Sequence, residues 1–213
     1  MEINWNQKRP SEKQKKKIKK KISNSFFKSV KIKENKNITT FQNIININNV
    51  NGGMKILSFK FEENEKLDWF LSRNRYSEID FFESFFKSEE FKIMSSDFSI
   101  KEGKEKQIAV NQFSSLKLDG ELASYMVSGG AYREFTDRRM AKSISTGVCN
   151  EIFRNRYEDV TIFSPQLSDG GKELKGLHEL SNWFKYIDVW SHCLTILDKG
   201  MRVIHIIVIT DED

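Results

Sequence analysis

The sequence predicts an α+β fold, in which an antiparallel sheet of about five or six strands packs against three or four helices behind a disordered basic N-terminal arm. Three observations support this prediction. Short alternating segments and a hairpin near residue 200 are typical of antiparallel strands. Two helical patterns precede the last strands instead of alternating with strands one by one, which argues against a doubly wound parallel sheet. The charge also divides sharply along the chain.

The charge division sets the expected domain organisation. The chain of 213 residues has a formal net charge of +5, but residues 1–36 carry +10 and residues 37–213 carry −5. The lysine run 13–21 repels itself, and ordering it would cost about 1–2 kcal/mol per residue with no core to offset that cost. We therefore predict a basic, Asn- and Lys-rich disordered arm and linker over residues 1–53, followed by a single acidic α+β domain over residues 54–213.

The linker, residues 37–53, can be read in two ways. Its isoleucines favour an extended edge strand, whereas its many asparagines favour turns. We predict a loose linker, because chain ends that are not tied down are usually disordered.

The first elements of the globular part follow the linker. Met54–Phe61 alternates polar and apolar residues, which is typical of a strand. Asn64–Arg73 has the spacing of a short helix. Ser77 opens a second helix with a sequence like a capping box, and the phenylalanines behind it recur at helical spacing. Phe91–Ile100 and Lys106–Phe113 are expected to be strands.

The later elements are predicted by clearer patterns. Asp119 can cap a helix that ends at Gly129-Gly130. A longer helix is expected from Thr136 to about Asn155, because apolar residues recur every four positions. Further expected elements are a strand at 160–163, a helix at about 173–184, and two strands at 189–197 and 202–210. A Lys199-Gly200 turn is expected to join these last two strands as a hairpin.

The basic arm is the first candidate functional feature. Lysine runs bind phosphate backbones by releasing counterions, whatever the base sequence. The residues concerned are Lys15, Lys16, Lys17, Lys19, Lys20 and Lys21. The stretch from Lys8 to Lys21 also resembles a nuclear import signal. The alternatives are a solvated tail without any partner, and an arm that folds back onto its own acidic domain until salt or a competing polyanion releases it.

Two histidines in the hairpin are the second candidate. With a two-residue loop, His205 opposes Leu194, and His192 lies on the same face as a diagonal neighbour. Such a pair could form half of a metal or acid–base site, for which His178 or Asp188 could supply a further ligand. The competing interpretation is that both rings fill half-buried strand positions.

Two further features have weaker chemical interpretations. Asp211, close after the last strand, stands where metal-dependent hydrolases often place a ligand, although an exposed terminus has the same composition. The glycine turn of Gly129, Gly130 and Arg133 could cradle an anion ahead of a helix. The sequence has neither the P-loop nor the dinucleotide pattern there, so a helix C-cap is the competing interpretation.

The functional expectation follows from these features. With no cofactor fingerprint or metal-ligand spacing, we predict neither a cofactor nor a metal. The sequence leaves open whether the protein is an enzyme and favours a protein without enzymatic activity. Two cysteines make no disulfide framework, and no apolar stretch is long enough for a membrane, so an intracellular protein, cytoplasmic or nuclear, is expected. We predict a binding protein whose arm contacts nucleic acid or an acidic protein surface. The alternatives are a small metal-dependent hydrolase or nuclease using His192, His205 and a carboxylate, and an inert arm beside a domain that binds a small ligand.

Overall fold

The computed structural model describes residues 7–22, 26–32, 35–98, 100–105, 111–130, 132–154, 156–164 and 192–211. Its strands are β1 (Phe27–Ser29), β2 (Gly53–Phe61), β3 (Asn111–Ser114), β4 (Val160–Ser164), β5 (His192–Asp198) and β6 (Val203–Thr210). Its α-helices are α1 (Glu12–Lys21), α2 (Lys36–Asn48), α3 (Glu65–Ser72), α4 (Phe81–Lys87), α5 (Glu89–Met94), α6 (Leu118–Ser128) and α7 (Arg138–Phe153). Short 3₁₀ turns are η1 (Tyr76–Ile79), η2 (Ser96–Phe98), η3 (Ser115–Lys117) and η4 (Tyr157–Asp159).

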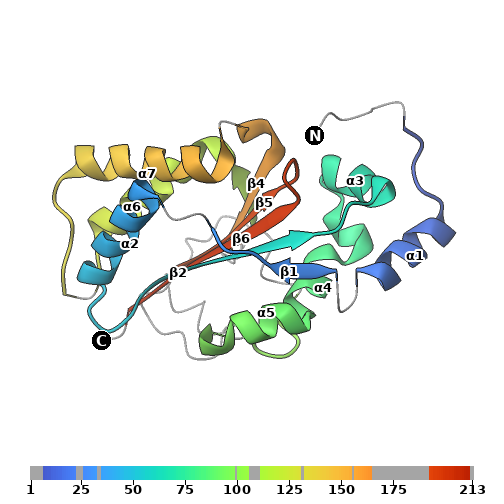
Figure 1. Cartoon of the computed structure of the whole chain (residues 1–213), viewed down its shortest axis with the longest axis horizontal. Coiled ribbons are helices and arrows are strands. Elements are labelled where there is room, and N and C mark those ends of the chain that lie inside the picture. The colour runs from blue at the N-terminus through green and yellow to red at the C-terminus, as the bar shows by residue number, and fades with distance from the viewer. Residues whose placement is uncertain are drawn as a thin grey trace, which may run out of the picture.

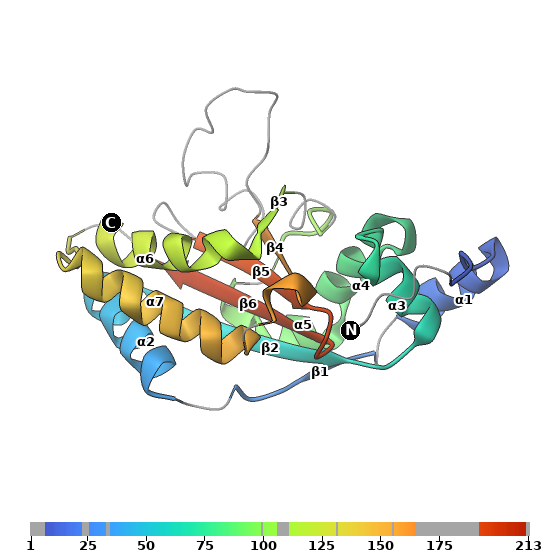
Figure 2. The same ribbon diagram turned by 90° about the horizontal axis from the view of Figure 1, so that it is seen from above.

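The strands form one six-stranded sheet in the order β1-β2-β6-β5-β4-β3, with every neighbouring pair antiparallel. Helices cover both faces of this sheet. Figures 1 and 2 show α2, α6 and α7 together at one side of the strands, α3, α4 and α5 at the other side, and α1 at the far end of the molecule. The predicted mixed α+β class with an antiparallel sheet is confirmed, although the sheet carries more helices than the three or four expected.

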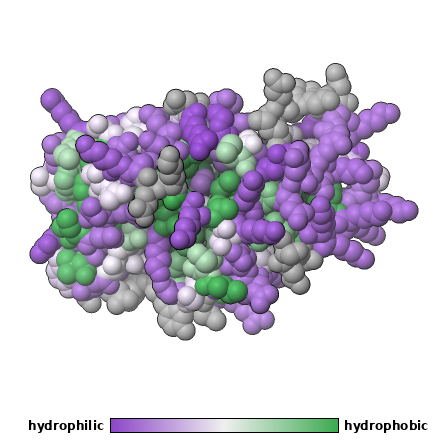
Figure 3. All heavy atoms as spheres, in the orientation of Figure 1, coloured by the Kyte–Doolittle hydropathy of each residue, from purple (hydrophilic) through white to green (hydrophobic). Residues whose placement is uncertain are grey.

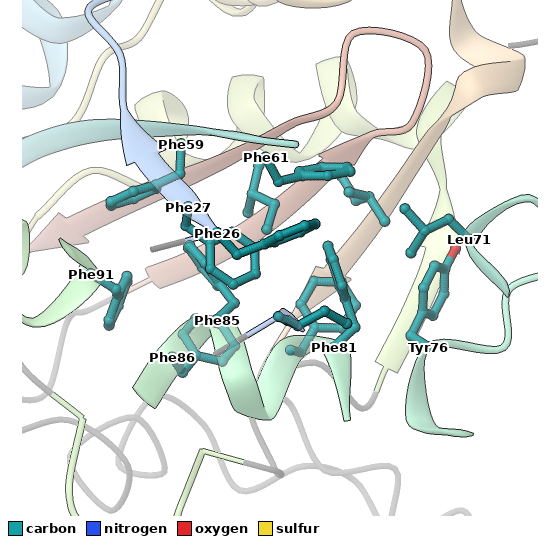
Figure 4. Close-up of a cluster of buried hydrophobic side chains, with 14 of the residues drawn as sticks. Phe26, Phe27, Phe59, Phe61, Leu71, Tyr76, Phe81, Phe85, Phe86 and Phe91 are labelled. Atoms are coloured by element: carbon teal, nitrogen blue, oxygen red, sulfur yellow. The ribbon is translucent and has the colours of Figure 1, made fainter. Parts of the chain in front are cut away.

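One face of the sheet packs an aromatic core. Alternate residues of β2 turn Phe59 and Phe61 toward α4, which contributes Phe85 and its neighbour Phe86 to the same cluster (Figure 4). The ring of Phe85 has its centroid 5.1 Å from Phe59 and 5.0 Å from Phe27 of β1. Tilted and edge-on contacts of this kind are the favoured arrangement of aromatic rings.

The other face packs an aliphatic core against α2, α6 and α7. Its strand residues alternate with those of the aromatic face, as the side-chain period of a strand requires. Leu194 of β5 pairs with Ile207 of β6, and Ile196 and Ile209 lie on the same face of the sheet. Val148 of α7 is fully buried in the same cluster. The spacing that predicted α7 is that of Met140, Ile144, Val148 and Ile152. The last three are buried as expected, whereas Met140 is exposed.

The lysine run does not form a disordered arm in the described residues, and this part of the prediction is corrected. Residues 12–21 are helix α1, which begins at a capping box between Ser11 and Gln14. Its last turn holds Lys19, Lys20 and Lys21, whose positive charges interact favourably with the negative C-terminal end of the helix dipole. Ile18 and Ile22 supply the apolar anchors that the prediction overlooked.

The predicted loose linker is likewise corrected, because residues 36–48 are helix α2. Its buried residues Ile38, Phe41, Ile44 and Ile45 recur at helical spacing, so packing prevails over the extended preference of isoleucine. Its asparagines tie the end of the helix down. The side chain of Asn48 donates to the carbonyl of Met126, 3.0 Å away.

The expected strand at residues 91–100 is also wrong. Ser88 caps α5 by accepting from the amide of Phe91, and Glu89 and Glu90 stand in its first turn. β1 from the arm supplies the sixth strand instead. The expected helix at 173–184 and most of the expected strand at 106–113 lie outside the described residues.

Candidate functional site

The β5–β6 hairpin is present as predicted, but its loop is longer. Asp198 pairs with Val203, so residues 199–202 form a four-residue loop in place of the expected two-residue turn. The Asp198 carboxylate fixes this loop by accepting from the amide of Met201 at 2.8 Å, and Arg202 adopts a left-handed conformation at φ 54°. This is a common way to build a four-residue hairpin loop.

The longer loop separates the two candidate histidines. His192 pairs with Ile209, and His205 pairs with Ile196. Both rings keep the predicted common face, because the register moved by an even number of positions. They nevertheless lie four residues apart along the sheet, about 13 Å at the usual rise of a strand. The predicted diagonal pair is therefore wrong, and His178 and Asp188, its expected helpers, lie outside the described residues.

His192 occupies a closed position. Its ring stacks on Tyr125 of α6, with 4.1 Å between the centroids and 24° between the planes. Burial lowers the pKa of His192 to about 4, so the ring is neutral at pH 7. The arrangement is that of a histidine filling a half-buried strand position.

Asp211 is fully buried and serves the fold. Its Oδ1 accepts from the amide of Asn51 at 3.1 Å, which ties the end of β6 to the turn before β2. Asp211 lies six residues beyond His205, about 20 Å along the strand. The three weak catalytic candidates are thus spread along the hairpin.

The glycine turn lies against this same carboxylate. Gly129 ends α6 at φ 69°, which confirms the predicted C-cap. The amide of Gly130 donates to the carbonyl of Arg133 at 2.9 Å, and a Cβ on Gly130 would lie 2.1 Å from Asp211 Oδ2. The turn is therefore filled by the chain's own groups, and its geometry gives no support to an anion site there.

His205 has a different environment from His192. It faces Ser58 of β2 across the register, and Ser58 Oγ lies 2.7 Å from His205 Nδ1. Burial lowers the pKa of His205 to about 4 against a smaller opposing effect of Asp198. His205 and Ser58 line a cavity of about 420 Å³ on the aliphatic side of the sheet.

Asp198 anchors the wall beside this cavity. Its side chain is 1% exposed, and Arg156 holds it with two hydrogen bonds of 3.0 and 2.7 Å. The hydrogen bond to Asp198 raises the pKa of Arg156 above its ordinary value. Sequence reasoning missed Ser58, Arg156 and Asp198, because they come from three distant segments. The one available signal was Asp198 at the start of a hairpin loop, where Asp commonly binds a backbone amide.

One face of α1 binds the chain's own carboxylates. Lys19 Nζ lies 2.6 Å from Asp80, and Lys21 Nζ lies 3.1 Å from Glu62. Just before the helix, Arg9 pairs with Glu78 at 2.7 Å. On this face the helix therefore contacts its own acidic domain, as in the alternative in which the arm folds back.

The opposite face of α1 is exposed. Lys13, Lys16, Lys17 and Lys20 follow the i, i+3, i+4, i+7 spacing of one helix face, and all four are exposed. Figure 3 shows a predominantly hydrophilic surface at the end of the molecule where α1 lies. We call these four residues the outer lysine face. Of the six lysines predicted to bind polyanions, Lys16, Lys17 and Lys20 belong to it, whereas Lys15, Lys19 and Lys21 pair with carboxylates.

Across the described ranges, no group of three or more His, Cys, Asp and Glu side chains is arranged to hold a metal ion. The helices of the same ranges include none that is both long and apolar enough to cross a membrane. Comparison of the chain with models of protein families, with curated proteins and with solved structures finds no match.

Proposed function

We propose that the chain is a binding protein that contacts the phosphate backbone of nucleic acid through the outer lysine face of α1. The observation that carries the proposal is the division of α1 into two basic faces. Lysines that pair with the domain hold the helix in place. Lys13, Lys16 and Lys17 point away and make no ion pair within the described ranges.

A phosphate backbone fits this face better than an acidic protein surface does. Stable protein interfaces usually place a buried aromatic or aliphatic anchor at their centre. The outer lysine face has no apolar residue, since Ile18 lies on the inner side and is buried. Binding by charge alone, independent of base sequence and weakened by salt, is what lysines without an apolar anchor provide.

The test is a triple charge reversal, Lys13→Glu, Lys16→Glu and Lys17→Glu, in the full chain. Affinity for a random-sequence DNA duplex, measured by fluorescence anisotropy from 50 to 200 mM salt, should fall. The slope of log K against log salt should shrink by about 0.9 for each lost phosphate contact. Affinity for polyglutamate, an acidic polypeptide, is measured under the same conditions and tests the alternative that the partner is an acidic protein surface.

The matched control reverses three exposed cations elsewhere, Lys92→Glu, Lys117→Glu and Arg139→Glu. It changes the net charge by the same amount and should keep most of the DNA affinity. If both triple variants lose the same amount of DNA affinity, the loss is explained by the change in net charge alone, and the proposal is overturned. Binding of polyglutamate as tight as that of DNA would overturn the choice of nucleic acid.

A further inference from the structure

The cavity beside His205 lies between segments that the sequence places far apart. It opens between residues 30–32, the start of α2, the end of α7 and the β5–β6 hairpin. Its volume of about 420 Å³ is within the range of sites that hold small organic molecules. It lies on the aliphatic face of the sheet and shares no residue with the outer lysine face, so it is independent of the proposed function.

The floor of the cavity carries a polar group without a partner. Ser58 engages Nδ1 of His205, and Nε2 has no hydrogen-bond partner among the described residues. The neutral ring can offer Nε2 as a single donor or acceptor, according to the proton on Nδ1. His205 is half-buried, and its Nε2 is not among the fully buried atoms that lack a hydrogen-bond partner. Nε2 is therefore accessible, and a ligand atom in the cavity can form a hydrogen bond with it.

The rim of the cavity carries an excess of positive charge. Lys31 and Arg154 line it, are exposed, and form no ion pair within the described ranges. Glu151 is the acidic rim residue that opposes them, since Asp198 is neutralised by Arg156. The N-terminal end of α2 also faces the cavity at Asn35, and the positive end of the dipole of this 13-residue helix adds to the field.

The walls between floor and rim are apolar. They are formed by Val30, Ile32, Ile38, Ile152, Met201 and Val203. A ligand that fits has an apolar body of modest size, one acidic group that reaches the rim, and a hydrogen-bonding atom near the floor.

We propose that this cavity binds a small amphipathic organic anion, with its apolar body against the aliphatic wall and its carboxylate or phosphate group at Lys31 and Arg154. His205 Nε2 makes a hydrogen bond to the ligand at the floor. Arg156 acts as a positioning residue, because it holds Asp198 and with it the loop that carries Met201.

The test uses three eight-carbon probes below their micelle concentrations: octanoate, octyl phosphate and octylammonium. Binding to the ¹⁵N-labelled full chain is followed by amide and His205 ring-nitrogen shifts. At least one anion should bind and shift the His205 ring signals, whereas octylammonium should bind at least about tenfold more weakly. Whichever anion binds more tightly identifies the acidic group.

Two variants locate the site. Lys31→Glu with Arg154→Glu changes only exposed residues and should weaken anion binding at least about tenfold. Val203→Phe fills the cavity and should abolish binding. The matched control, His192→Gln, alters the other hairpin histidine, which lies outside the cavity, and should leave the affinity unchanged.

The proposal is overturned if neither anion binds, if octylammonium binds as tightly as the anions, or if the rim variant and Val203→Phe keep the affinity of the unmodified chain. A loss of affinity in His192→Gln as large as in Val203→Phe would equally exclude this cavity as the place of binding.

Discussion

The two faces of the sheet are built from the same strands but differ in how completely they are packed. The aromatic face is closed by interlocking phenylalanine rings around Phe85. The aliphatic face carries both hairpin histidines and leaves a cavity at one of them. The contrast indicates that stability is concentrated on one side of the sheet, while the other side has room for polar groups that a packed core would exclude.

The largest expected effect comes from opening the closed face. Phe85→Ala removes a fully buried ring at the centre of the aromatic core and should lower the free energy of unfolding by about 3–5 kcal/mol. Val203→Phe, which adds volume at the cavity, should change it by less than about 1 kcal/mol. Both values come from urea denaturation. A cost for Val203→Phe close to that of Phe85→Ala would mean that the cavity face is packed as tightly as the aromatic one.

A smaller effect is expected from the ion pair beside the cavity. Arg156→Ala leaves the carboxylate of Asp198 buried without its cation and should cost about 3 kcal/mol of unfolding free energy. The double variant Arg156→Met with Asp198→Leu should recover much of that loss, because it removes the buried carboxylate of Asp198 together with its cation. If the double variant is as unstable as Arg156→Ala alone, the loss reflects packing rather than the buried charge.

The smallest effect concerns the two histidines. Both have a folded pKa of about 4, below the usual value of 6.5, so folding favours the neutral rings. Their contribution is complete above pH 6.5 and is lost as the pH falls toward 4, since the unfolded chain then binds more protons. Between pH 7 and pH 5, each should remove about 1–2 kcal/mol of unfolding free energy.

His192→Gln and His205→Gln should each flatten this pH dependence, and the double variant should flatten it further. Denaturation curves at pH 5 and pH 7 measure the difference. A full pH dependence in both single variants would place its origin in other groups. Equal effects on stability from both histidines, with an effect on anion binding from His205 alone, would sharpen the contrast between a closed and an open position.

The hairpin, the helices α6 and α7 and the α+β class could be predicted from the sequence, because each depends on the local spacing of apolar residues. The sequence-based predictions were wrong where the contacts of individual side chains determined the local structure. Asp198 lengthened the hairpin loop and thereby separated His192 from His205. Isoleucine in α2 was interpreted by its extended preference, although its spacing is helical.

The cavity could not be predicted from any single segment. Lys31, Ser58, Arg154 and His205 come from four stretches of chain, and only the packing of α2 and α7 onto the sheet brings them together. The two faces of α1 were foreseeable in part. The fold-back follows from the opposite charges of arm and domain, whereas the lysines that remain outside depend on the helix that the prediction omitted.

The pairing of β2 with β6 has a consequence for how the chain reaches its native state. Gly53 pairs with Thr210, so the middle of the sheet joins segments that are far apart in the sequence and are synthesised at different times. Until β6 is made, β2 and β5 both present unpaired, apolar edges to any other nascent chain. High contact order of this kind slows folding and lengthens that exposure. We therefore expect refolding yield to fall steeply with protein concentration, as intermolecular strand pairing competes with the arrival of β6.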